Sequence, residues 1–345
     1  MDNRRLKKVL IIKPSSLGDI IHALPVANAL KETVPEVEID WAVFRAHEPV
    51  LAGHPAITNI IAFDRHRGGF RELSRFIRVL RAAEYDAVID LQGLLRSGLM
   101  TLACRAGRKI GFENAREGAR FFYNEKIRVS DSDMHAVDRY LLALDAFSVA
   151  APETPRFDIA VNGADLTEAG RILKDAGIGE NDEFATIAPS ARWMTKRWEA
   201  EKFARLALAL KERRGLKYIF IGSADEAGVM SGLEGLTGRE SLAFGKTSLK
   251  GLAALLGRAR LMITNDSGPM HIAAAMGTRA LAIFGPTDPG RTGPYGRGHR
   301  VITSGAACSP CLKRECPEKK HMMCMKDITV EDVFRAAEEM LEEKK

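Results

Sequence analysis

Residues 9–21 have the sequence VLIIKPSSLGDII, which combines an apolar run, a short polar turn and the start of a helix-period pattern. This order predicts a strand, a tight loop and a helix over 20–31. Because the loop follows a strand of a predicted parallel sheet, it is expected where open α/β folds bind ligands. Asp19 can take a proton from a bound hydroxyl there, while Ser16 can cap the helix and Gly18 allows a ligand to approach closely. The plainer interpretation is that Asp19 only stabilises the helix N-terminus.

Alternation of strands and helices continues through both halves of the chain, which favours an α/β fold with doubly wound parallel sheets. Strands are predicted at residues 9–12, 39–43, 60–63, 87–91, 184–188, 218–221, 261–264 and 280–284. Helices are predicted at residues 20–31, 70–83, 94–104, 135–147, 166–176, 199–213, 225–234, 249–258, 268–276 and 330–345. The periodicity lapses over 151–166, so we expect one domain over 1–155 and another over 165–329. The terminal helix over 330–345 can pack back on the first domain.

The bulk composition agrees with a two-domain globular protein. The 345 residues are 46% hydrophobic and 28% charged, which is enough to form two cores. No apolar run reaches the ~18–20 residues of a membrane span, and no signal peptide is recognisable, so a cytoplasmic protein is expected. The net charge of +6 is concentrated over residues 65–128, where 14 Lys or Arg accompany 7 Asp or Glu. This basic window is either a solvated surface or a site for an anionic partner, such as phosphorylated lipid, acidic sugar or nucleic acid.

One loop in the C-terminal half suits a phosphate group. Residues 264–271 (TNDSGPMH) follow a predicted strand and begin a helix, whose first N–H groups and positive dipole end point at the loop. Ser267 adds a hydroxyl, and His271 falls on the first turn of the helix. The segment lacks the GxxxxGK[ST] pattern of a P-loop, and an ordinary N-cap with a packed histidine is the plainer alternative.

Three more loops at strand ends can complete a nucleotide site. Residues 189–198 (PSARWMTKRW) hold two indole rings and three cations, of which Lys196 is the expected phosphate contact because its ammonium is a compact charge. In residues 222–226 (GSADE), either acidic side chain can accept hydrogen bonds from ribose hydroxyls. Residues 285–289 (GPTDP) form a rigid turn that can shape the same pocket. The plainer alternatives are a solvated loop, a helix cap and a chain reversal.

The cysteines of the chain cluster near its C-terminus. Four of the five occur as Cys308-x2-Cys311-x4-Cys316-x7-Cys324, within a span of 17 residues. Four thiols so close in sequence can bind a structural zinc ion. The spacing is irregular, and reduced thiols or a disulfide are the alternatives.

In combination, these motifs resemble those of the ADP-heptose:lipopolysaccharide heptosyltransferases, glycosyltransferase family 9. The segment 13–25 (KPSSLGDIIHALP) is similar to the opening motif of this family, and segments 266–271 and 285–289 look like its C-terminal donor motifs. The resemblance extends over nearly the whole chain. The segments that look most like the first heptosyltransferase of the core pathway are 39–43, 85–95 and 121–124. The cysteine-rich tail looks more like the second enzyme.

The resemblance implies a GT-B fold, in which two Rossmann-like domains face each other across a cleft. The N-terminal domain then binds the acceptor, and the C-terminal domain binds ADP-heptose. Members of the family are inverting and need no metal for catalysis, so Asp19 is expected to act as general base. Lys196 and the helix start at Ser267 and Gly268 are expected to stabilise the leaving ADP. The reaction implied is transfer of heptose from ADP-L-glycero-D-manno-heptose to the Kdo of Kdo2-lipid A, in lipopolysaccharide inner-core biosynthesis.

The resemblance also divides the candidate residues between two sites. Besides the catalytic pair Asp19 and Lys196, the expected donor-binding residues are Ser190, Arg192, Lys196, Asp225, Glu226, Asp266, Ser267, Gly268, His271 and Thr287. The expected acceptor-binding residues are Ser16, Gly18, Arg65, Arg67, Gln92, Arg116 and Arg120. The basic window then faces an anionic acceptor and the inner leaflet, which predicts a peripheral location at the inner face of the inner membrane.

Three alternatives stay open at this point. The first is a heptosyltransferase II-type enzyme that adds heptose to a heptosylated core. The second is a GT-B sugar-nucleotide epimerase, which needs no lipid acceptor. The third is a basic nucleic-acid-binding module, but the basic window lacks the interleaved aromatic residues of RRM or OB folds, so no nucleic-acid partner is expected.

Overall fold

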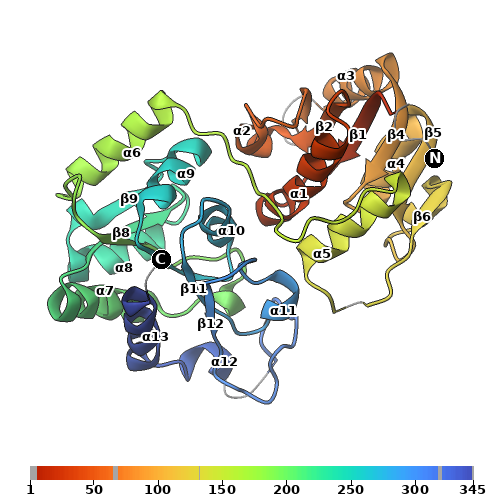
Figure 1. Ribbon diagram of the computed structural model, residues 1–345. Helices are drawn as coiled ribbons and strands as arrows, with labels where there is room; N and C mark the ends of the chain where they lie inside the picture. Colours follow the sequence, from red (N-terminus) through yellow and green to blue (C-terminus); the bar gives the residue numbers. More distant parts are fainter. Residues whose placement is uncertain (1–5, 65–68, 132, 318–320, 344–345) are drawn as a thin grey trace. The chain divides into compact units, whose positions relative to one another are not determined.

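The computed structural model describes residues 6–64, 69–131, 133–317 and 321–343. The chain divides into two compact units, Met1–Ala160 and Val161–Lys345, coloured red to yellow-green and green to blue in Figure 1. The division falls in the interval between the two predicted domain ranges. Each unit is built on one parallel sheet with helices packed against it.

The first unit has a parallel sheet in the order β3-β2-β1-β4-β5-β6. Its strands are β1 (Lys8–Ile12), β2 (Glu38–Phe44), β3 (Asn59–Phe63), β4 (Glu84–Asp90), β5 (Arg105–Phe112) and β6 (Glu125–Ile127). Central strands of such a sheet are buried on both faces, which explains the continuous apolar run in β1. The order is that of Rossmann folds, whose winding reverses between the first and fourth strands.

The helices of the first unit form two groups. Helix α1 (Leu17–Thr33) packs with α5 (Ala136–Leu141), whereas α3 (Gly69–Ala82) and α4 (Leu95–Ala103) pack together. Right-handed crossovers place these groups on opposite faces of the sheet. The apolar cluster under α3 and α4 includes Leu10, Ile12, Phe76, Leu80, Val88 and Met100. The shorter helices are α2 (Glu48–Leu51), η2 (Arg45–His47), η3 (Ala119–Phe122) and η4 (Leu142–Phe147).

The second unit repeats this architecture, with a parallel sheet in the order β12-β11-β10-β7-β8-β9. Its strands are β7 (Phe184–Ala188), β8 (Lys217–Gly222), β9 (Leu242–Phe244), β10 (Leu261–Asn265), β11 (Ala280–Ile283) and β12 (Arg300–Ile302). Its helices are α6 (Gly163–Asp175), α7 (Ala200–Arg214), α8 (Ala227–Thr237), α9 (Leu249–Arg258), α10 (Gly268–Ala275), α11 (Pro289–Thr292), α12 (Met323–Lys326), α13 (Val330–Glu342), η5 (Met194–Lys196) and η6 (Arg239–Ser241). Within the described ranges, none of the helices is both long and apolar enough to cross a bilayer.

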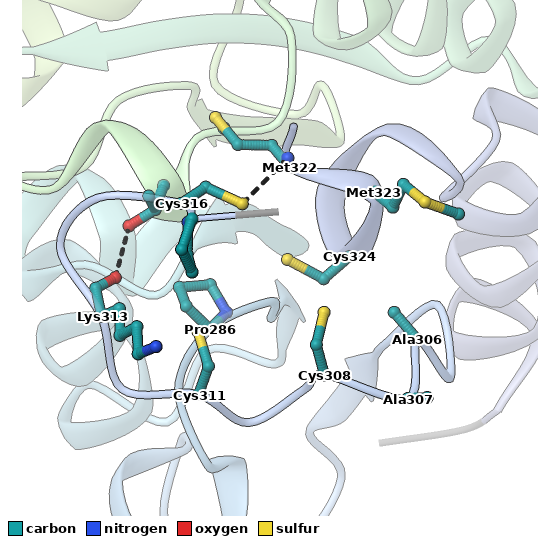
Figure 2. Close-up of a pocket in the computed structure, with 12 residues that line it drawn as sticks. Pro286, Ala306, Ala307, Cys308, Cys311, Lys313, Cys316, Met322, Met323 and Cys324 are labelled. Carbon is teal, nitrogen blue, oxygen red and sulfur yellow. Dashed lines mark hydrogen bonds between the residues drawn. The ribbon is translucent and has the colours of Figure 1, made fainter. Parts of the chain in front are cut away.

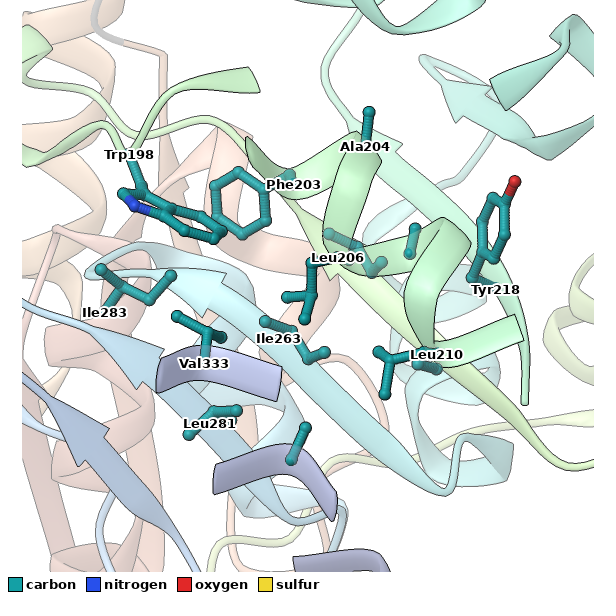
Figure 3. Packing of buried hydrophobic residues seen from close by; sticks show 14 of the residues in the cluster. Trp198, Phe203, Ala204, Leu206, Leu210, Tyr218, Ile263, Leu281, Ile283 and Val333 are labelled. Atoms are coloured by element: carbon teal, nitrogen blue, oxygen red, sulfur yellow. The ribbon is translucent and has the colours of Figure 1, made fainter. Parts of the chain in front are cut away.

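The terminal helix α13 contributes to the core of the second unit. Val333 and Phe334 are fully buried in one cluster with Trp198, Phe203 and Ile263, and Figure 3 shows Val333 in this packing. From the sequence, we expected that this helix can pack back on the first domain. Instead, its apolar face is covered by α7 and the second sheet, so the segment belongs to the second unit.

The expected α/β class with two doubly wound parallel sheets is confirmed. The sequence pattern missed four strands: β5, β6, β9 and β12. Three of them have only three residues, which is too short for a periodic signal. The fourth, β5, has the sequence RAGRKIGF, in which cations and glycines interrupt the apolar alternation.

Candidate active site

The first candidate site lies where the winding of the first sheet reverses, between β1 and β4. The chain leaves β1 after Ile12 and leaves β4 after Asp90, so two loops meet at the carboxyl ends of neighbouring strands. A hydrogen bond of 3.3 Å from the Ser15 N–H to Gln92 Oε1 joins these loops. The structure therefore brings the opening loop and the predicted acceptor residue Gln92 to the position where open α/β folds bind ligands.

Asp19 stands on the first turn of α1, which begins at Leu17. Its Oδ2 accepts hydrogen bonds from the Ser16 N–H at 3.1 Å and from the Ser16 hydroxyl at 2.6 Å. Its Oδ1 accepts a hydrogen bond from the Tyr140 hydroxyl at 3.2 Å. The Asp19 side chain nevertheless remains 38% exposed, and the neighbouring Gly18 adds no side chain that could cover it. The carboxylate is therefore held in one orientation while part of it stays accessible to a ligand.

The buried Lys13 ammonium sets the charge state of Asp19. Lys13 Nζ lies 4.0 Å from Asp19 Oδ1, donates a hydrogen bond to the Leu91 carbonyl at 3.3 Å, and lies 4.8 Å from the centre of the Tyr140 ring. Burial pushes the pKa of Asp19 upward, but Lys13 and the hydrogen bonds from Ser16 outweigh it, so the pKa lies well below its usual range. Burial lowers the pKa of Lys13, and the charge of Asp19 opposes that effect. The carboxylate is thus ionised at neutral pH.

Asp90, at the end of β4, is a site residue that the sequence analysis missed. It is fully buried, and its Oδ1 accepts hydrogen bonds from the N–H groups of Gln92 (2.9 Å) and Gly93 (3.0 Å). Its Oδ2 accepts a hydrogen bond from the Tyr123 hydroxyl at 2.7 Å. Burial raises the pKa of Asp90 above its ordinary value, although these hydrogen bonds act in the opposite direction. Asp90 therefore fixes the shape of the loop that carries Gln92.

The second candidate site lies at the equivalent reversal in the second sheet, between β7 and β10. Asn265, the last residue of β10, joins this strand to both ends of the loop over 189–198. Its Nδ2 donates to the Pro189 carbonyl at 2.8 Å, and its Oδ1 accepts from the Trp198 N–H at 3.0 Å. The loops over 189–198 and 264–271, which the sequence analysis singled out, therefore meet at one end of the sheet.

Lys196, Asp266 and Thr287 form a compact polar group at this second site. The Lys196 ammonium forms an ion pair of 2.5 Å with Asp266 Oδ2, and the Thr287 hydroxyl donates to the same oxygen at 2.7 Å. Lys196 Nζ also lies 4.6 Å from the centre of the Trp193 ring. One of the three ammonium protons is directed to Asp266, so Asp266 and Thr287 orient the cation while two donors remain for a ligand.

The start of α10 adds hydrogen-bond donors to the same site. Helix α10 begins at Gly268, and its N-cap residue, Ser267, makes no side-chain cap hydrogen bond. The Ser267 hydroxyl lies 2.9 Å from the hydroxyl of Thr264, and His271 is buried on the first turn. The Ser190 hydroxyl is buried without a hydrogen-bond partner in the described part of the chain. An unpaired buried hydroxyl beside a helix start is suited to an anionic oxygen.

The other predicted donor residues lie at the edge of this site. Asp225 is exposed after β8, and a hydrogen bond from Ser223 lowers its pKa. Glu226 Oε2 accepts a hydrogen bond from the Ser223 N–H at 2.9 Å, which stabilises the β8–α8 turn. Both carboxylates therefore follow the strand next to β7, as a ribose contact requires. Arg192 is exposed, and its side chain has no hydrogen bond or ion pair with the described residues.

Of the four predicted acceptor arginines, two lie within the described residues. The Arg116 N–H donates to the Gly93 carbonyl at 2.9 Å, so Arg116 lies beside the loop of the first site, with its side chain exposed. Arg120 is exposed on η3, with its guanidinium 5.0 Å from the centre of the Phe121 ring. Arg65 and Arg67 lie outside the described residues.

A cavity of about 800 Å³ in the second unit is lined by all four clustered cysteines, as Figure 2 shows. Free thiols are present at Cys308, Cys311, Cys316 and Cys324. Thr195 Oγ1 donates to the Lys313 carbonyl at 3.1 Å, so the cysteine loop contacts the turn that carries Lys196. Within the described ranges, no three His, Cys, Asp or Glu residues are grouped so that they could hold a metal ion. Zinc binding by these four thiols therefore stays a prediction.

Comparison with known proteins assigns these features to a family. The model of glycosyltransferase family 9 (heptosyltransferase) matches residues 73–322. Lipopolysaccharide heptosyltransferase 1 of Pseudomonas aeruginosa is 34% identical over 325 residues, which cover 90% of this chain and 87% of that protein. The Escherichia coli protein of the same name is 31% identical over 308 residues, which cover 85% of this chain and 92% of that protein.

Solved structures agree with this assignment. A glycosyl transferase family 9 protein from Veillonella parvula has a TM-score of 0.86 at 26% identity, covering 99% of this chain and 98% of that one. The E. coli heptosyltransferase WaaC with ADP has a TM-score of 0.76 at 26% identity, covering 96% of this chain and 99% of that one. The two Rossmann-like units are thus those of a GT-B glycosyltransferase. The chain belongs to glycosyltransferase family 9, the heptosyltransferase family, and is a glycosyltransferase.

Proposed function

We propose that this enzyme acts in lipopolysaccharide inner-core biosynthesis, moving heptose from ADP-L-glycero-D-manno-heptose to the Kdo of Kdo2-lipid A. The P. aeruginosa and E. coli relatives are named lipopolysaccharide heptosyltransferase 1. The E. coli structures contain ADP and ADP-2-deoxy-2-fluoro heptose. The observation that carries the proposal is the Asp19 carboxylate, which is ionised, oriented and partly exposed at the reversal point of the first sheet.

Asp19 acts as the general base. The acceptor hydroxyl becomes acidic only as its oxygen attacks the anomeric carbon, so a base of low pKa takes the proton late in the step. Ser16 and Tyr140 hold the carboxylate in position, and Lys13 keeps it deprotonated before the attack. Attack on the face opposite the leaving ADP inverts the anomeric configuration.

The leaving diphosphate is stabilised by the second site without a metal ion. Lys196 places a positive charge there, oriented by Asp266 and Thr287. The Ser190 hydroxyl and the first N–H groups of α10, with Ser267 at its start, donate hydrogen bonds to phosphate oxygens. The remaining proposed donor contacts are Arg192, Gly268 and His271 around the diphosphate and Asp225 or Glu226 at the ribose.

The acceptor is held at the first site. Gln92 accepts a hydrogen bond from the Ser15 N–H of the opening loop. The next residue, Gly93, accepts a hydrogen bond from the Arg116 N–H, so Gln92 and Arg116 both lie at this loop. Guanidinium groups suit the carboxylates of Kdo and the phosphates of lipid A, because both anions accept paired N–H donors. Arg120 provides a further cation on η3. The protein then works at the cytoplasmic face of the inner membrane, as a peripheral protein.

A heptosyltransferase II-type enzyme is the second candidate. A Campylobacter jejuni relative at 26% identity is named lipooligosaccharide heptosyltransferase 2, and an E. coli relative at 28% identity is named lipopolysaccharide heptosyltransferase 3. Such an enzyme uses the same base and the same donor site. Only the acceptor differs, since it already carries heptose.

The test is release of ADP from ADP-heptose, measured in EDTA with and without deacylated Kdo2-lipid A. Release that depends on this acceptor supports the proposal. Release only with a heptosylated core moves the enzyme one step along the pathway. Release without any acceptor favours an epimerase or hydrolase, and a rate that appears only after Mg²⁺ is added contradicts the metal-independent mechanism.

A further inference from the structure

One helix of the first unit has an exposed apolar stripe. Leu95, Leu99 and Leu102 of α4 are 45%, 50% and 55% exposed. At 3.6 residues per turn, these three side chains fall within about 60° of one another around the helix axis. Met100 and Thr101 on the same helix are buried. The exposed leucines are therefore one face of α4, rather than scattered side chains.

A second element extends this face. A Cβ atom at Gly98 would lie 2.5 Å from Phe122 Cδ2 and 3.2 Å from Ala119 Cα, so α4 and η3 are in direct contact there. Around the helix axis, the position of Gly98 is within about 100° of all three leucines. The contact at Gly98 therefore places η3 next to the leucine stripe. Phe121 of η3 is 76% exposed. We call Leu95, Leu99, Leu102 and Phe121 together the apolar face.

Positive charges border the apolar face. Lys109 Nζ donates to the Leu102 carbonyl at 3.1 Å, and the Arg120 guanidinium lies 5.0 Å from the centre of the Phe121 ring. Arg96 follows Leu95 on α4 and is exposed, but its guanidinium is directed toward β2, 5.1 Å from the centre of the Phe44 ring, so it does not belong to this border. Glu117 places an acidic group at this border, and its Oε2 accepts the Leu95 N–H at 3.2 Å. Apolar side chains surrounded by an excess of cations match the surface of an anionic bilayer, in which acyl chains lie beneath negative headgroups.

We infer that the apolar face is the surface by which the protein docks on an anionic lipid bilayer. Single exposed leucines are ordinary on protein surfaces, but a clustered patch with a charged border marks an interaction site. Helix α4 begins directly after the loop that carries Gln92, so docking through α4 brings the first site close to the bilayer. This inference rests on the proposed function, since it supposes an acceptor anchored in the same membrane.

The test compares substitutions of exposed apolar side chains on the apolar face with substitutions of exposed leucines elsewhere. Leu99→Gln, Leu102→Gln and Phe121→Gln are combined in one variant, which leaves the border cations in place. The control combines Leu166→Gln on α6 with Leu236→Gln on α8, where the side chains are 51% and 48% exposed in the second unit. Both variants are sedimented with vesicles of equimolar phosphatidylglycerol and phosphatidylcholine, and with vesicles of phosphatidylcholine alone.

Wild type and control are expected to bind the anionic vesicles equally, and the apolar-face variant to bind about tenfold more weakly. Binding by the apolar-face variant equal to wild type overturns the inference, as does a wild type that ignores anionic vesicles. Size-exclusion chromatography of the same proteins is the second readout. Loss of a dimer with unchanged vesicle binding assigns the face to a second copy of the chain and also overturns the inference.

ADP release with the deacylated, water-soluble acceptor separates this inference from the proposed function. The apolar-face variant is expected to match wild type on that acceptor and to be slower on Kdo2-lipid A embedded in anionic vesicles. If vesicle binding depends on the apolar face but neither protein releases ADP with either acceptor, docking stands and the proposed reaction fails. If ADP release is normal but vesicle binding is unaffected, the reaction stands and docking fails.

Discussion

Replacing Lys13 with Met tests whether the buried ammonium keeps Asp19 ionised. Met preserves an unbranched side chain of similar length but removes the charge that lies 4.0 Å from Asp19 Oδ1. At this distance two unit charges attract by ~1 kcal/mol in water and by ~4 kcal/mol at the effective dielectric constant of protein surfaces. Because the Asp19 side chain is 38% exposed, solvent screening favours the lower part of this range. We take about 1–2 kcal/mol, which is about one pKa unit.

The direction of the effect follows from the depressed pKa of Asp19. The carboxylate form is present above the ordinary pKa of an aspartate and is lost only as the pH falls through the lower, folded-state pKa. Lys13→Met raises the pKa of Asp19 in the folded protein. The acid limb of the pH profile of kcat is therefore expected at a pH about one unit higher than in wild type. The stability that the ionised carboxylate contributes is likewise lost at a higher pH than in wild type.

The assay measures kcat for ADP release with deacylated acceptor from acidic to neutral pH. Lys174→Met, at an exposed lysine on α6 of the second unit, is the matched control for loss of one positive charge. Thermal unfolding at each pH separates loss of rate from loss of fold. An acid limb that stays at the wild-type position in folded Lys13→Met protein would refute the role assigned to Lys13.

Three further substitutions test the two sites. Asp19→Asn removes the base, so kcat is expected to fall by about 10²–10⁴-fold. The affinity for ADP-heptose, measured by calorimetry, is expected to stay unchanged. Weaker donor binding at unchanged kcat contradicts the role of Asp19 as base. Lys196→Met removes charge stabilisation of the leaving ADP and lowers kcat by about 10²–10³-fold, and unchanged turnover excludes that role. Ser190→Ala removes a buried hydroxyl that has no partner among the described residues, so ADP is expected to bind about tenfold more weakly, with no loss of the free energy of unfolding. An ADP affinity equal to that of wild type shows that Ser190 does not contact the diphosphate.

The reversal points of both sheets could be located from the sequence because each begins with a local signal. An apolar strand, a polar turn and a helix-period segment are adjacent along the chain at residues 9–21 and again at 261–276. Asp19 and Ser267 fall in those turns, at the starts of α1 and α10, and lie at the two candidate sites. The strand ends also marked Ser190 and Asp225, although the sequence could not show that the Ser190 hydroxyl lacks a partner.

The groups that hold these residues in place could not be found in this way, because their partners are distant in sequence. Asp90 is paired with Tyr123, and Asp19 with Tyr140 more than a hundred residues away. Lys13 looks like an ordinary turn lysine in the sequence, and only the packed structure shows that it is buried. The cysteine spacing suggested a metal, but ligand geometry depends on the loop conformation rather than on spacing.

The most direct test of the proposed reaction is mass spectrometry of Kdo2-lipid A after incubation with the enzyme and ADP-heptose. We predict a product heavier by one heptosyl residue, attached to Kdo, and no such product with Asp19→Asn. Failure of the folded enzyme to modify Kdo2-lipid A, combined with heptose transfer to an already heptosylated core, would contradict the proposed acceptor.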